Sequence, residues 1–157
     1  MKKHSSRAQL QQGFMLLESL IAILIFAFGV LGIVALSARA VSAQSDAQYR
    51  TEAANLADEM AAKIALSVDR LSLTSSVSAQ LQAFATPSAN ALVSNWLDKV
   101  TGTTSSINDP AVTPGLPGAT VALQTIVVTG NRLDITVSWK GPADTSMRKN
   151  TLVTYVN

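Results

Sequence analysis

The stretch that decides the fold is GFMLLESLIAILIFAFGVLGIVALSA, residues 13–38. Within it, 20 consecutive positions from Ser19 to Ala38 carry no charge. A helix rises about 1.5 Å per residue, so this length spans roughly 30 Å, the thickness of the hydrocarbon core of a bilayer. A buried helix of a soluble protein is the alternative, but such helices are rarely apolar on every face. We therefore expect a membrane-spanning helix over residues 14–38.

Basic side chains precede this apolar run. Lys2, Lys3 and Arg7 lie before it with no acid among them, which predicts a cytoplasmic N-terminus and an exported remainder. An ordinary secretory signal has a shorter apolar run followed by a small-residue cleavage site. Because the run here is long, the sequence predicts a single-pass anchor.

The helix is expected to continue past the apolar run. Residues 39–66 contain no Gly or Pro and are rich in good helix formers. Apolar side chains recur at helical spacing along one side of this segment, and they are Ala53, Leu56, Ala57, Met60, Ala61 and Ile64. One helix from about Phe14 to about Leu66, on the order of 80 Å long, would therefore bury one side of its second half on a domain formed by the later residues.

A short helix and two loops are expected next. Residues 89–100 have apolar side chains at helical spacing and predict a short helix that buries Trp96. Residues 71–86 are rich in Ser and predict a loop with at most one helical turn. Residues 101–118 are dense in Thr, Ser, Pro and Gly, which is typical of a surface loop. The 39 residues after that loop are too few to form a core alone, so a single domain is expected.

The last third of the chain predicts three antiparallel strands. Residues 119–129 are β-branched, Gly130 and Asn131 suit a tight hairpin, and residues 132–140 alternate between apolar and polar side chains. Residues 151–157 would form the closing strand. One face of the middle strand carries Leu133, Ile135, Val137 and Trp139, and the other carries Asp134, Thr136, Ser138 and Lys140. Three strands need a cover on one face, and the long helix is the natural cover. The predicted fold class is α+β.

Composition excludes several kinds of chemistry. The chain has no cysteine, and His4 is its only histidine. Beyond residue 13 there are 9 basic and 10 acidic side chains, so the high pI reflects the N-terminal segment and gives no support for nucleic-acid binding. Without His or Cys after residue 13, His-based catalysis, thiol chemistry and most zinc sites are excluded from that part of the chain. We expect no enzyme activity and no cofactor.

The start of the apolar helix resembles the class III signal of type IV pilins and pseudopilins. A basic leader ends in Gly13, Phe14 follows, and Glu18 precedes the apolar run. Met15 stands where Thr is more usual. The resemblance implies that residues 1–13 are a leader, that a prepilin peptidase cuts between Gly13 and Phe14, and that Phe14 is then N-methylated.

The rest of the chain looks most like the PilV type of minor pilin, the type IV pilus modification proteins. The stretches that carry this likeness are FGVLGIVALSARA, YRTEAANLADEMAAKI, NWLDKV, GLPG and RLDITVSWKG. The likeness implies a pilin-like fold, with residues 14–38 as a transmembrane and filament-core helix and residues 39–157 as a periplasmic or extracellular domain. The expected partners are a prepilin peptidase, other minor pilins, the major pilin and the inner-membrane assembly platform. The expected location is the inner membrane before assembly and the pilus afterwards.

If the chain is a minor pilin, Glu18 is the residue that we expect to act in assembly. In a bundle of apolar helices a lone carboxylate is costly unless it is paired, and cleavage would create a cationic amine at Phe14. We expect the amine of a neighbouring subunit, or of the same chain, to pair with Glu18.

Other hypotheses remain at this point. A minor pseudopilin of a type II secretion system would have the same leader and helix, and an anchored enzyme or sensor is a further alternative. Asp134 and Asp144 are candidate calcium ligands, but without an ordered loop pattern we interpret them as solvated turn acids and expect no metal site. Trp96 and Trp139 are interpreted as core residues.

Overall fold

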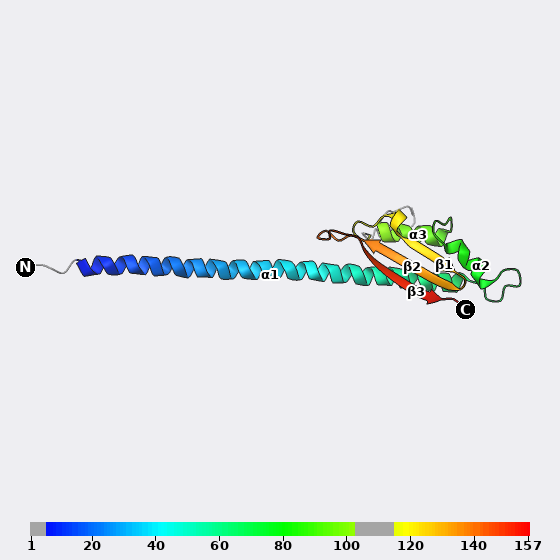
Figure 1. Ribbon diagram of the computed structural model, residues 1–157, viewed down its shortest axis with the longest axis horizontal. Coiled ribbons are helices and arrows are strands. Elements are labelled where there is room, and N and C mark those ends of the chain that lie inside the picture. Colours follow the sequence, from blue (N-terminus) through cyan, green and yellow to red (C-terminus); the bar gives the residue numbers. More distant parts are fainter. Residues whose placement is uncertain (1–5, 103–114) are drawn as a thin grey trace, which may run out of the picture. The chain divides into compact units, whose positions relative to one another are not determined.

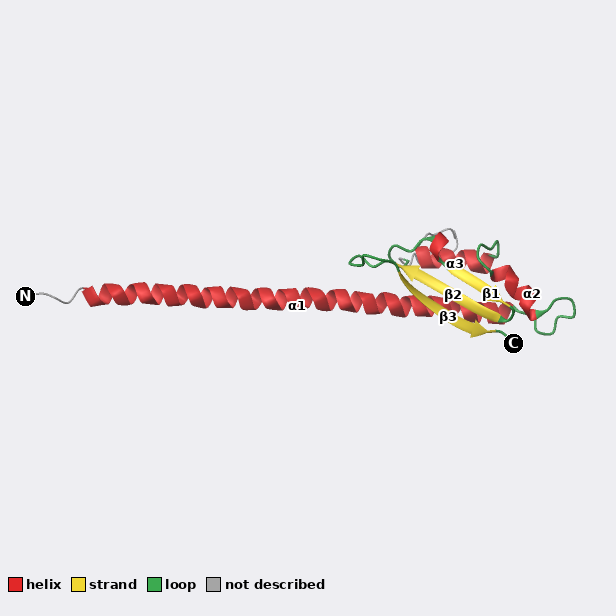
Figure 2. Ribbon diagram, viewed as in Figure 1, coloured by secondary structure: helices red, strands yellow, loops and turns green. Residues whose placement is uncertain are grey.

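The computed structural model describes residues 6–102 and 115–157, with side chains from Phe14 onward. The chain forms two compact units, Met1–Gln44 and Ser45–Asn157, and the second is called the head below. The elements are α1 (Ser6–Ser67), α2 (Val77–Leu81), η1 (Gln82–Phe84), α3 (Ala91–Thr101), η2 (Val121–Leu123), β1 (Thr125–Thr129), β2 (Arg132–Trp139) and β3 (Arg148–Tyr155) (Figure 1). A long N-terminal helix packed on a small antiparallel sheet confirms the expected α+β, pilin-like layout (Figure 2).

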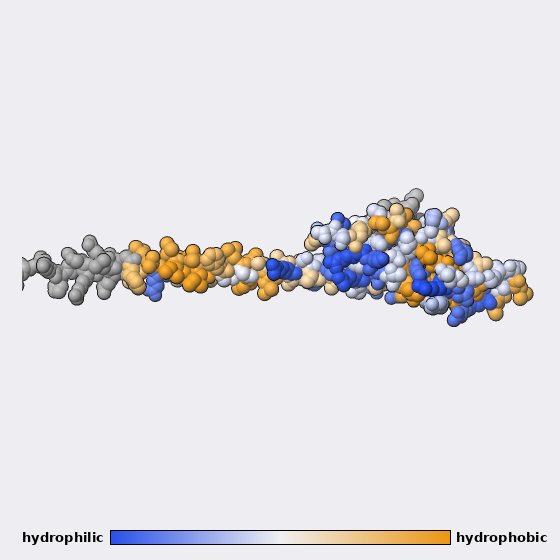
Figure 3. All heavy atoms as spheres, viewed as in Figure 1, coloured by the Kyte–Doolittle hydropathy of each residue, from blue (hydrophilic) through white to orange (hydrophobic). Residues whose placement is uncertain are grey.

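The first unit is helical wherever the structure describes it. Its side chains from Phe14 to Gln44 are exposed almost throughout, and most of them are apolar (Figure 3). By length and composition, α1 is the one helix among the described residues that could cross a membrane. The helix begins at Ser6 and not at Phe14 as expected, because SRAQLQQ consists mainly of good helix formers and contains no Gly or Pro.

The part of α1 inside the head is amphipathic, as expected. The residues that it buries recur along one side and are Ala53, Leu56, Ala57, Met60, Ile64 and Val68 just past its end. Arg50, Asp58 and Lys63 are exposed on its other sides. The buried side chains join one hydrophobic core with the sheet and α3, so this part of α1 covers one face of the sheet.

The sheet has β2 in the middle, with antiparallel β1 and β3 on either side. Thr129 pairs with Arg132 across a two-residue loop in which Gly130 has a positive φ of 61°, which fits the expected hairpin. The face of β2 that carries Leu133, Ile135, Val137 and Trp139 is buried, as the alternation predicts.

Three details of the strand prediction are wrong. Residues 121–123 form a 3-10 turn and not the start of the first strand, and β3 begins at Arg148, earlier than residue 151. Ser138 is buried although the alternation places it on the open face. The reason is Gln124, whose Oε1 accepts the Ser138 N–H at 2.7 Å while its Nε2 donates to the Ser138 carbonyl at 3.0 Å.

Helix α3 confirms the short helix expected over residues 89–100. The side chain of Asn90 caps its N-terminus by accepting from the Leu92 N–H at 2.9 Å. Trp96 is buried, and its Nε1 donates to the Leu56 carbonyl on α1 at 2.9 Å. The stretch expected as a loop with one helical turn contains α2 and η1, and most of the loop expected over residues 101–118 lies outside the described residues.

The two edges of the sheet differ. At the β1 edge, the Thr86 N–H donates to the Ile126 carbonyl at 3.0 Å, and the Ile126 N–H donates to Thr86 Oγ1 at 2.9 Å. The outer edge of β3 has no such backbone partner among the described residues. Among the described residues, the chain therefore closes one edge of the sheet and leaves the other open.

Candidate assembly site at the start of the apolar helix

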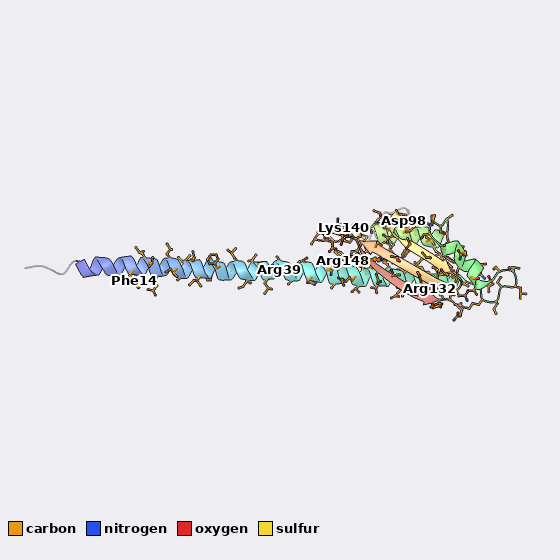
Figure 4. The ribbon with its side chains drawn as sticks, in the orientation of Figure 1. Phe14, Arg39, Asp98, Arg132, Lys140 and Arg148 are labelled. Atoms are coloured by element: carbon orange, nitrogen blue, oxygen red, sulfur yellow. The ribbon has the colours of Figure 1, made fainter. Side chains whose placement is uncertain are left out.

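The candidate site lies near the start of α1. It contains the adjacent residues Gly13 and Phe14, and Glu18 follows Phe14 after about one turn. Phe14 and Glu18 are four residues apart, so their side chains share one face of the helix. Phe14 is 70% exposed and is labelled in Figure 4, and Glu18 is also exposed. Glu18 has no hydrogen-bond or ion-pair partner among the residues whose side chains are described. The structure thus presents, one turn after Phe14, an exposed carboxylate that the described side chains do not pair.

The backbone is helical on both sides of the Gly13–Phe14 bond. In an α-helix each N–H bonds the carbonyl four residues earlier, so the carbonyls of residues 10–13 are the acceptors for residues 14–17. Cutting this bond would remove those acceptors and leave four N–H groups at a new helix N-terminus. A helix N-terminus favours negative charge, and Glu18 lies just after these four residues.

The helix surface after Glu18 is suited to apolar surroundings. Its exposed side chains as far as Leu36 include twelve large hydrophobic ones, which are Leu20, Ile21, Ile23, Leu24, Ile25, Phe26, Phe28, Val30, Leu31, Ile33, Val34 and Leu36. Two hydroxyls bond within the helix: Ser19 donates to the Met15 carbonyl at 2.9 Å, and Ser37 donates to the Ile33 carbonyl at 3.0 Å. Their polar groups are satisfied without water. Between Glu18 and Ser37, only Glu18 is a polar side chain without a partner among the residues whose side chains are described.

The two candidate calcium ligands lie in separate ion pairs. Asp134 Oδ1 is 2.7 Å from Arg132 Nε, and Asp144 Oδ1 is 2.7 Å from Arg148 Nη2. The Arg148 hydrogen bonds lower the pKa of Asp144, and the Gly141 N–H adds to this effect. Both acids are therefore paired with arginine and are not the solvated turn acids expected. No group of acidic side chains or histidines among the described residues is placed to hold a metal ion.

Sequence reasoning missed a cluster of charges in the head. Asp46 on α1 accepts from Arg50 Nε at 3.1 Å and is 3.0 Å from Arg148 Nη1 on β3. The spacing of Asp46 and Arg50 at i and i+4 indicates a helical ion pair, but no local pattern joins Asp46 to a residue 102 positions later.

Fold and site together define a chain with an α+β head and an N-terminal helix long and apolar enough to cross a membrane. This chain matches no family model, no curated protein and no solved structure.

Proposed function

We propose that this chain is a minor type IV pilin of the PilV type, a structural protein that is processed and then assembled into pili. The observation that carries the proposal is Glu18, which lies one turn after Phe14 and has no partner among the residues whose side chains are described, on a helix whose following surface is exposed and apolar. The α+β head is in keeping with it.

The proposed mechanism begins with cleavage between Gly13 and Phe14 by a prepilin peptidase. The new amine at Phe14, which is then methylated, is largely cationic at neutral pH. When the apolar helices of neighbouring subunits pack, Glu18 loses its contact with water and requires a partner. The Phe14 amine of a neighbouring subunit provides it, and the pair fixes the axial register of helices whose surfaces are otherwise apolar.

Assembly by this contact is head to tail. A subunit that stacks on its neighbour by a repeated rise and rotation forms an open helical filament. Before assembly the subunit would lie in the inner membrane with a cytoplasmic N-terminus. There it would meet the assembly platform, the major pilin and other minor pilins, with which it would prime assembly or form the tip.

The test follows the mature N-terminus and the incorporation of the full-length chain in piliated cells. Mass spectrometry is expected to find a chain that starts at methylated Phe14. Removing one partner of a desolvated ion pair costs about 3–5 kcal/mol. We therefore expect Glu18→Ala to be cleaved normally but to reach sheared pili at a level at least about tenfold lower.

Asp58→Ala is the matched control, because Asp58 is an exposed acid on the same helix. It should be incorporated like the wild type. A chain that starts at any residue other than Phe14 contradicts the proposal. Normal pili with failed protein secretion after deletion would instead identify a pseudopilin of a type II secretion system.

A further inference from the structure

The outermost strand β3 has one side that can accept a further strand. It pairs with β2 on its inner side, and its outer side bonds to no other backbone among the described residues (Figure 1). The strand is eight residues long, and its register with β2 is continuous, without a bulge or a proline. Apart from the charges at its start, β3 therefore has none of the features that keep an edge strand from pairing.

Alternate residues of β3 direct their backbone groups outward. The Val156 N–H donates to the Asn131 carbonyl at 2.9 Å, in line with the register of β2 and β3. Backbone groups alternate between the two sides of an antiparallel strand, so the even-numbered residues of β3 bond to β2 and the odd-numbered ones face outward. The outward residues, whose side chains are also exposed, are Lys149, Thr151, Val153 and Tyr155.

A second copy of β3 can pair with all of these outward residues at once. When two copies run antiparallel about a twofold axis beside Leu152, Thr151 lies opposite Val153, and Lys149 lies opposite Tyr155. Each outward residue then exchanges two hydrogen bonds with the residue opposite. An axis at Thr151 or at Val153 would place Tyr155 or Lys149 opposite a residue outside β3. The axis at Leu152 is therefore the one that uses the whole edge, and the surface is complementary to itself.

The side chains also fit this arrangement. Lys149 is the only charged residue among the outward ones, and it faces Tyr155 of the second copy, whose ring attracts a cation. Val153 and Tyr155 are 46% and 64% exposed, and pairing would cover part of both. On the other face, Leu152 packs against the core and would lie beside Leu152 of the second copy. No like charges meet across the axis.

The pair also sets the direction of the two heads. Asp46, near the start of the head, lies 3.0 Å from Arg148 at the start of β3. Arg70, just past the end of α1, donates to the Asn157 carbonyl at 2.6 Å. Within the head, α1 therefore runs in the same direction as β3. Because the two copies of β3 are antiparallel, their Ser45 ends would lie at opposite ends of the pair.

We propose that β3 binds β3 of a second copy of this chain and joins two heads whose Ser45 ends point in opposite directions. Since α1 is long and apolar enough to cross a membrane, the two chains are anchored in facing membranes or filaments and not side by side in one. The pairing does not depend on the proposed function, so it can be tested independently of pilus assembly.

Single cysteines report the pairing, because the chain contains no cysteine of its own. Leu152→Cys lies on the axis, so the full-length protein in detergent micelles is expected to form a disulfide-linked dimer on mild oxidation. Thr151→Cys and Val153→Cys are matched controls that are more exposed than Leu152. Each lies roughly 7–8 Å from the same residue of the second copy, too far for an unstrained disulfide. No dimer at Leu152→Cys, or as much dimer with either control, overturns the proposal.

Thr151→Pro tests the pairing without cysteine. The Thr151 N–H faces outward, so proline leaves the bonds between β2 and β3 intact but removes one donor from each copy. Sedimentation equilibrium in micelles is expected to show dimerisation at least about tenfold weaker than in the wild type. Thr151→Ala is the matched control, because it loses the same hydroxyl, which bonds Thr136, but keeps the N–H. Equal association of the two variants, both folded by circular dichroism, overturns the proposal.

Two populations of vesicles test the direction of the pair. Both carry full-length Leu152→Cys protein with the head outside, each with a different epitope tag, and they are mixed before oxidation. Disulfide-linked dimers that contain both tags are expected. Dimers that contain only one tag would show pairing within one membrane and would overturn the proposed direction.

Discussion

At the scale of single residues, Glu59 links two elements of the head. Its carboxylate lies 2.8 Å from Lys63 Nζ one turn along α1, and 2.6 Å from Lys99 Nζ on α3. The hydrogen bond from Lys63 and then that from Lys99 lower the pKa of Glu59. The spacing of Glu59 and Lys63 is visible in the sequence, whereas the contact with Lys99 depends on how α3 packs against α1.

Lys99→Met is expected to lower the free energy of unfolding by about 0.5 kcal/mol at pH 7, because the pair is largely exposed and screened by water. A lowered folded-state pKa means that the carboxylate stabilises the fold above its unfolded pKa and loses this effect as pH falls through the folded value. The difference between wild type and variant should therefore shrink below pH 4.5, the ordinary value for this carboxyl.

Denaturant unfolding at pH 7 and pH 3 measures this difference, and an NMR titration should show a higher Glu59 pKa in the variant. Lys149→Met is the control, because Lys149 is an exposed lysine that makes no ion pair with the described residues. A difference between wild type and Lys99→Met that stays constant with pH would contradict the assignment.

At the scale of elements, two glycines play different roles. Gly115 lies against the backbone at the end of α3, where a Cβ would overlap Gly102 N, and the neighbouring Leu116 N–H donates to the Val100 carbonyl at 2.8 Å. Gly130 has a positive φ in the hairpin but open space around it. The first position excludes a side chain by close approach, and the second disfavours one by backbone conformation alone.

Gly115→Ala should therefore cost more stability than Gly130→Ala. A left-handed conformation costs a non-glycine residue about 1–2 kcal/mol, which is the expected loss for Gly130→Ala. Gly115→Ala must move the backbone at the end of α3, so we expect about 3 kcal/mol or more. Denaturant unfolding of both variants measures which substitution lowers the free energy of unfolding more. Equal decreases would show that the backbone at the end of α3 moves at little cost.

The elements also show which features of the fold are determined by the local sequence. The apolar periodicity of Leu56, Met60 and Ile64 predicted the buried side of α1, because helical spacing alone sets it. The burial of Ser138 was not predictable, since it depends on a side chain 14 positions earlier. The 3-10 turn at residues 121–123 contains one β-branched residue, Val121, and buries none of its side chains, so neither composition nor packing favours a strand there.

At the scale of the whole molecule, every buried residue of the hydrophobic core lies between Ala53 and Val156, within the head. A fragment of residues 45–157 thus contains the entire core. We expect this fragment to be soluble and to unfold in a single cooperative transition. Circular dichroism and near-ultraviolet melting with coincident midpoints would confirm it, and a fragment that lacks fixed near-ultraviolet signal would refute it.

The residues of the candidate assembly site, Gly13, Phe14 and Glu18, could be recognised in the sequence because they lie close together in the chain, and their role stays a prediction. The cluster of charges around Asp46 could not be recognised in this way, since Arg50 on α1 and Arg148 on β3 come together only after folding. The buried Nε1 of Trp139, which has no partner among the described residues, also became apparent only in the packed structure.

The difference between the two sheet edges limits how many chains can pair through this sheet. Thr86 occupies the β1 edge, so in the described part of the head β3 is the strand left for pairing with another chain. Two copies joined at β3 would use up both open strands, and the chain of pairings would stop at two. Pairing at the sheet edge can therefore join two heads and no more. A long polymer of this head has to be built through contacts of another kind.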